Sequence, residues 1–100
     1  MLTASDGGTS PAADLANRVA DTAAALLASA RDAGMTITGD SRIKECDAAV
    51  LLGYAPDTLA KKRTQGSGPA AYSRGFGGAR ISYRIDDLAQ WIEAGREVED

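Results

Sequence analysis

The helix-breaking residues between positions 42 and 69 constrain the fold of this chain more than any other feature. Gly53 ends a predicted helix over residues 42–52, Pro56 begins the next helix, and Gly66 ends it. Glycine readily adopts the left-handed conformation that follows a helix, and proline is favoured in a first helical turn. The second helix therefore has about nine residues and a rise of only ~13 Å. A helix this short suits presentation to a partner better than structural support.

A β-hairpin is predicted after the two short helices. Strands at 71–74 and 80–85 flank the glycine-rich turn GFGG at 75–78, which is a typical hairpin pattern. In the second strand apolar and polar side chains alternate, so one face is expected to point inward and the other to be basic. The inward residues are Ile81, Tyr83 and Ile85, and the outward residues are Arg80, Ser82 and Arg84.

A final helix, capped by Asp86 or Asp87, is expected to return apolar side chains to the core. Trp91 and Tyr83 are both expected to be core residues, and the acidic tail at 97–100 to fray. Helix, turn, short helix and hairpin follow in the order of a winged helix-turn-helix. The expected fold is mainly α, with a small β-hairpin wing in a domain spanning 42–96.

The N-terminal third of the chain has a different character. Residues 1–10 are rich in glycine, serine, threonine and aspartate and are predicted to be disordered, and an alanine-rich helix is predicted over 11–34. Ser10 would cap this helix. Its apolar stripe is thin, so the helix packs on its own domain, dimerises or stays free. The stripe consists of Leu15, Val19, Thr22 and Leu26.

Charge is distributed unevenly along this acidic chain of net −3. Residues 58–84 contain six lysines and arginines and no acid, while residues 1–57 and 85–100 are each net acidic. A basic block of this kind is the electrostatic footprint expected of a nucleic-acid surface.

The composition gives little indication of catalysis, metal binding or membrane insertion. There is no histidine and a single cysteine, Cys46, which is expected to be a small buried or half-buried residue. We therefore expect no catalytic residue, no metal, no cofactor and no enzyme. No apolar run reaches the ~18 residues of a membrane span, and a cytoplasmic location fits best.

Three ordered segments, DAAVLLGYAPDTL, GSGP and YRIDDLAQWI, carry a family resemblance. With this spacing the chain resembles the excisionase-type and AlpA-type DNA-binding domains, a branch of the MerR-like winged helix superfamily. The family pattern is E-A-A-x-L-L-G-V-S-P-x-T-L, a basic W-R segment, G-x-G-P, a short wing and Y-R-x-x-D-L-x-x-W-L. The match spans about residues 43–95 and leaves the N-terminal helix outside it.

The resemblance implies two groups of DNA-contacting residues. The recognition helix would supply Asp57, Thr58, Lys61, Lys62 and Arg63, with Thr58 and Lys61 favoured for the major groove and Asp57 more favoured as a helix cap. The wing would supply Arg74, Phe76, Arg80 and Arg84. For Phe76, insertion into a minor groove and packing on the core remain open.

Three positions depart from the family pattern. Ala55 stands where the family has a serine cap, and Tyr54 replaces a small buried aliphatic residue, so its ring must find extra room or reach solvent. Lys62 stands where an aromatic residue is common, which leaves the contacting face of the recognition helix open.

The function implied by the resemblance is sequence-specific binding of double-stranded DNA. The chain would act as an excisionase (recombination directionality factor) or as an AlpA-like transcription regulator of a phage or mobile element. Its expected partners are DNA, a second copy in a homodimer or cooperative oligomer, and an integrase. Two alternatives remain: the DNA-recognition domain of a phage small terminase subunit, and a protein-interaction adaptor on a winged-helix scaffold.

Overall fold

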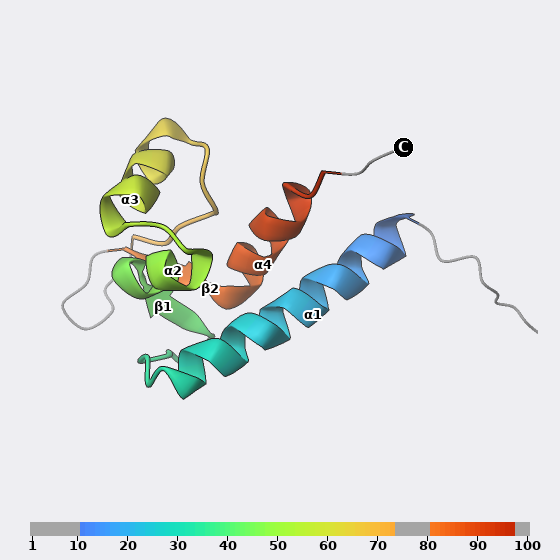
Figure 1. The fold of residues 1–100 in the computed structure, drawn as a ribbon, viewed down its shortest axis with the longest axis horizontal. Coiled ribbons are helices and arrows are strands. Elements are labelled where there is room, and N and C mark those ends of the chain that lie inside the picture. Colours follow the sequence, from blue (N-terminus) through green and yellow to red (C-terminus); the bar gives the residue numbers. More distant parts are fainter. Residues whose placement is uncertain (1–10, 74–80, 98–100) are drawn as a thin grey trace, which may run out of the picture.

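The protein is mainly helical, with one small antiparallel sheet. The computed structural model describes residues 11–73 and 81–97, and within them lie four helices and two strands. In chain order they are α1 (Pro11–Asp32), β1 (Arg42–Lys44), α2 (Glu45–Leu52), α3 (Pro56–Gln65), β2 (Ser82–Arg84) and α4 (Ile85–Ala94). Figure 1 shows α1 running beside α4, while α2 and the sheet lie at the C-terminal end of α1 and α3 lies beyond them, against α2.

Helix α1 packs mainly on α4. Leu26 and Ala30 in its C-terminal half are buried, whereas Leu15 near its start is 36% exposed. The ten residues of α4 rise only ~15 Å and cannot cover all 22 residues of α1. Packing of this helix on its own domain is therefore observed, and its dimerisation stays a prediction. The predicted cap Ser10 lies outside the described residues.

Polar bonds join α1 to α4 as well. Glu93 accepts hydrogen bonds from Arg18 Nε at 3.3 Å and from Thr22 Oγ1 at 2.8 Å. Arg18 is also ion-paired with Asp14, one turn earlier on α1. These bonds explain why the predicted apolar stripe of α1 contains a threonine.

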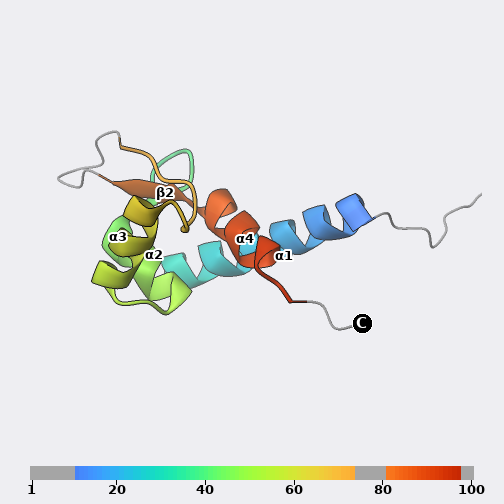
Figure 2. The ribbon, with the colours of Figure 1, turned by 90° about the horizontal axis from the view of Figure 1, so that it is seen from above.

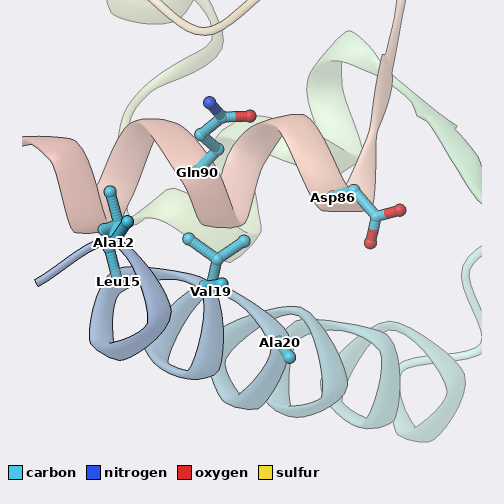
Figure 3. Close-up of a pocket in the computed structure, with 7 residues that line it drawn as sticks. Ala12, Leu15, Val19, Ala20, Asp86 and Gln90 are labelled. Atoms are coloured by element: carbon cyan, nitrogen blue, oxygen red, sulfur yellow. The ribbon is translucent and has the colours of Figure 1, made fainter. Parts of the chain in front are cut away.

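Helices α1 and α4 leave a groove of about 540 Å³ between them. Figure 3 shows that the lining side chains of α1 are apolar and that those of α4 are polar. The lining residues are Ala12, Leu15, Ala16, Val19, Ala20, Asp86 and Gln90.

The predicted start of the second helix at Arg42 is wrong. Residues Arg42–Lys44 form β1, and α2 begins at Glu45. Strand β1 pairs antiparallel with β2, with Ile43 opposite Tyr83, and both of these side chains are fully buried. Pairing with a strand some 40 residues later thus overrides the local helical pattern.

The predicted hairpin is observed only in part. Tyr72 and Ser82 exchange two backbone hydrogen bonds, of 2.8 and 2.9 Å, in an isolated antiparallel bridge. The turn at 75–78 lies outside the described residues. Ser82 was expected on the outer face, but it is fully buried, and its backbone pairs with Lys44 on one side and Tyr72 on the other. Its hydroxyl accepts a hydrogen bond of 2.9 Å from Arg42 Nη1.

Helix α4 differs from the prediction in its start and in one core residue. It begins at Ile85, with Arg84 as N-cap residue and no side-chain cap bond, so Asp86 and Asp87 lie in its first turn instead of capping it. Trp91 is half-buried and not a core residue, because its indole N–H donates to the Ser67 carbonyl at 3.2 Å near the surface. The assignment of Tyr83 to the core is confirmed.

The two short helices meet through small side chains. Ala48 and Ala49 of α2 and Leu59 of α3 are fully buried in one core cluster. Gly53 and Gly66 follow α2 and α3 with φ of 79° and 74°, left-handed values that favour glycine. The predicted bounds of α3, from Pro56 to Gln65, are confirmed.

Candidate nucleic-acid interface

Helix α3 has one buried side and one fully exposed side. Leu59 is its buried anchor, and no side-chain cap bond is made at Ala55, its N-cap residue. Five residues on the opposite side are exposed and fall on one face of the helix. This outward face consists of Asp57, Thr58, Lys61, Thr64 and Gln65.

The structure separates the three consecutive cations at 61–63. Lys61 lies on the outward face, and no ion pair within the described part of the chain involves it. Lys62 and Arg63 are both half-buried, on the two flanks of α3 next to Leu59. Since successive helical residues are rotated by about 100°, the three side chains point in three directions. A row of charges in the sequence is therefore not a patch of charges in space.

Arg63 is bound to Glu45, in the first turn of α2. Its Nε lies 2.8 Å from Glu45 Oε2 and its Nη2 lies 3.3 Å from Glu45 Oε1, so the pair is bidentate. The hydroxyl of Tyr83 in β2 donates to the same Glu45 Oε2 at 2.8 Å. One carboxylate therefore joins α2, α3 and the sheet.

The three groups of this network alter one another's ionisation. Burial opposes the charge on Glu45, but the hydrogen bonds from Arg63 and Tyr83 outweigh it and hold the pKa of the carboxyl below its ordinary value. The hydrogen bond to Glu45 raises the pKa of Arg63, and burial together with Glu45 raises the pKa of Tyr83. At neutral pH the network thus contains a carboxylate, a guanidinium and a neutral phenol.

Lys62 lies against an aromatic pair on the other flank of α3. Its Nζ is 5.4 Å from the centre of the Tyr54 ring, within the range of a cation–π contact. Tyr54 in turn meets Trp91 of α4 edge to face, with ring centres 6.2 Å apart. The extra ring of Tyr54 therefore finds room at the surface, and Lys62 packs on it where the family pattern has an aromatic residue.

The structure describes only one of the four predicted wing residues. Arg74, Phe76 and Arg80 lie outside the described residues. Arg84 is half-buried, and its hydrogen bond with Tyr72, followed by the charges of Asp86 and Asp87, raises its pKa. Arg84 thus has acidic neighbours that the acid-free sequence block does not contain.

Neither a metal-ligand cluster nor a membrane-spanning helix occurs in the parts of the chain that the structure describes. Residues 11–73 and 81–97 contain no cluster of three or more His, Cys, Asp or Glu residues that could hold a metal ion. None of the described helices is both long enough and apolar enough to cross a membrane. Cys46 was expected to be buried or half-buried but is exposed, because it lies in the first turn of α2 away from Ala48 and Ala49.

Two exposed residues of α3 were missing from the predicted set. Thr64 and Gln65 share the outward face with Thr58 and Lys61, and projecting α3 as a helical wheel would have identified both. The role of Glu45 had no such signal, since it lies 18 residues from Arg63 and 38 from Tyr83 in the sequence.

Comparison with known proteins adds no assignment. No protein-family model matches the chain, and no curated protein and no solved structure matches it either.

Proposed function

We propose that this protein binds double-stranded DNA sequence-specifically, with α3 as a recognition helix in the major groove. The observation that carries the proposal is the division of α3 into a buried side at Leu59 and an outward side that includes Lys61. Its side chains match base edges: lysine suits guanine, glutamine suits adenine, and the threonine methyl suits thymine.

The element order supports the same proposal. A helix, a strand, two short helices and a second strand paired with the first follow one another from α1 to β2. A winged helix-turn-helix would use elements in this order to support its recognition helix. Arg74, Phe76 and Arg80 would extend the contact along phosphates and into a minor groove.

Within this function we infer the role of an excisionase or an AlpA-like regulator, on the strength of the sequence resemblance. One short helix contacts few base pairs, so useful affinity requires a second copy or tandem sites. We also propose an integrase as a partner, and a role in a terminase as the alternative. A neighbouring integrase gene would favour excision, and a neighbouring terminase gene would favour packaging.

Salt dependence tests DNA binding directly. With about four phosphate contacts, log K for a random-sequence duplex should fall against log salt with a slope of about −4. Fluorescence anisotropy of a labelled duplex between 50 and 300 mM salt, roughly the range in which counterion release is measured, gives this slope. A flat dependence would contradict the proposal.

A protein-interaction adaptor is the second candidate, and the groove between α1 and α4 favours it. Its lining is mainly apolar and includes the exposed Asp86, as in grooves that receive an amphipathic helix. Under this function DNA binding would be absent, and substitutions at Lys61 would leave partner binding unchanged.

A further inference from the structure

The side chains of Arg63 and Lys61 cannot both face the same surface of the protein. They are two residues apart on α3, so their side chains diverge by roughly 200° around the helix axis. Lys61 belongs to the outward face, while Arg63 points back toward Glu45 of α2. If α3 lies in a DNA groove through Lys61, Arg63 faces the body of the protein.

A single apolar anchor does not fix the orientation of α3. Leu59 is the buried residue of this helix, and a helix attached at one point is free to rotate about it. The bidentate pair with Glu45 supplies a second attachment on one flank, and Lys62 on Tyr54 supplies a third on the other. Tyr83, fully buried in β2, connects the second attachment to the core.

The charges of this network also suit the helix ends that they join. Glu45 is in the first turn of α2 and Arg63 in the last turn of α3, so each charge opposes the partial charge of its own helix end. To reach a phosphate, Arg63 would have to abandon a partly buried carboxylate, which is costly.

We infer that Arg63 is a positioning residue for DNA recognition: through Glu45 and Tyr83 it sets the angle of α3, and so which base edges the outward face reaches. This inference rests on the proposed function. It assigns to Arg63 an effect on sequence discrimination and no phosphate contact of its own.

The experiment compares two duplexes with five forms of the protein. One duplex has a random sequence, and the other is selected from a randomised library with the wild-type protein. The variants are Arg63→Gln, Glu45→Gln, the double variant and, as a control, Lys61→Met. Circular dichroism confirms that each is folded at the assay temperature, and Tyr83→Phe replaces any variant that is not.

Positioning predicts that Arg63→Gln lowers the preference for the selected duplex about tenfold, the discrimination that one base contact supplies. The slope of log K against log salt for Arg63→Gln should match that of the wild type. For Lys61→Met the slope should be less steep by about 0.9. Glu45→Gln should lower the preference to the same extent, and the double variant should be no worse than either single one.

Two other outcomes overturn the inference and remain distinguishable. If Arg63 contacts phosphate, Arg63→Gln loses about 0.9 in slope and Glu45→Gln, which frees the arginine, binds both duplexes more tightly. That result would reject Arg63 as a positioning residue, while the proposed DNA binding would still hold. If the wild type binds neither duplex, the proposed function fails, and the inference fails with it.

Discussion

Glu45 and Arg63 are 18 residues apart in the sequence and form a bidentate ion pair, with Nε 2.8 Å from Oε2. This pair places the end of α3 against the start of α2. It also divides the basic run at 61–63 into one exposed cation and two that hold the helix.

Replacing Tyr83 with phenylalanine tests how far the core supports this pair. The ring stays buried, and only the hydrogen bond from the phenol to Glu45 is lost. Because the acceptor is charged, we expect a decrease of about 1–2 kcal/mol in the free energy of unfolding. Urea denaturation at pH 7 measures it. Tyr54→Phe is the matched control, since it keeps the ring that meets Trp91 and Lys62 and, within the described residues, the Tyr54 hydroxyl makes no hydrogen bond. An equal effect of both changes would contradict the role of the hydrogen bond.

Lowering the pH should reduce the free energy of unfolding, because Glu45 becomes protonated. Its pKa in the folded protein lies below the ordinary value of 4.5, so its contribution to stability is fully present above about pH 4.5 and is lost as the pH falls through the folded-state pKa. The groups that face it are Arg63 from α3 and Tyr83 from β2.

The measurement is the difference in unfolding free energy between wild type and Glu45→Gln. It should be largest at pH 6–7 and shrink as the pH falls through the folded-state pKa of Glu45, because both proteins then carry a neutral group at position 45. Asp40 has a lowered pKa as well, because Thr38 and Arg42 hydrogen-bond to it, but its effect is common to both proteins and cancels. A difference that does not depend on pH would contradict the account.

Truncation of Leu59 should release α3. The side chain is fully buried in the core cluster, so Leu59→Ala should cost about 2–5 kcal/mol. Hydrogen exchange should then increase most at the backbone amides of α3. Leu15→Ala is the control, because Leu15 is 36% exposed. It should lower the free energy of unfolding much less than Leu59→Ala. Equal losses would show that Leu59 is not the anchor.

Much of the fold is readable from the sequence, where local chemistry determines it. The bounds of α3 follow from Pro56 and Gly66, which act within a few residues. Strand β1 was missed because Arg42–Lys44 is extended only through its pairing with β2. The outward face of α3 was predictable from helical periodicity, whereas the bond between Glu45 and Arg63 depends on tertiary packing and leaves no local pattern.

Lys62 and Lys61 should differ in DNA binding although they are neighbours. Lys62 is drawn toward the ring of Tyr54, and Lys61 is exposed. Replacing each with methionine keeps the apolar part of the side chain and removes the charge. We expect Lys62→Met to change the salt slope by less than half of the roughly 0.9 expected for Lys61→Met. Equal changes would show that Lys62 leaves Tyr54 to contact DNA.

The most direct test of the central claim compares Lys61→Met with Arg31→Met on a random-sequence duplex. Both variants remove one exposed positive charge, but Arg31 belongs to the last turn of α1. In Figure 1 this end of α1 lies on the opposite side of α2 and the sheet from α3. Figure 2 shows the same elements from above, with α2 and α3 together beyond the end of α1. If α3 enters the DNA groove, Lys61→Met should make the slope of log K against log salt less steep by about 0.9, and Arg31→Met should leave the slope unchanged. Equal slopes for the two variants would contradict recognition by α3.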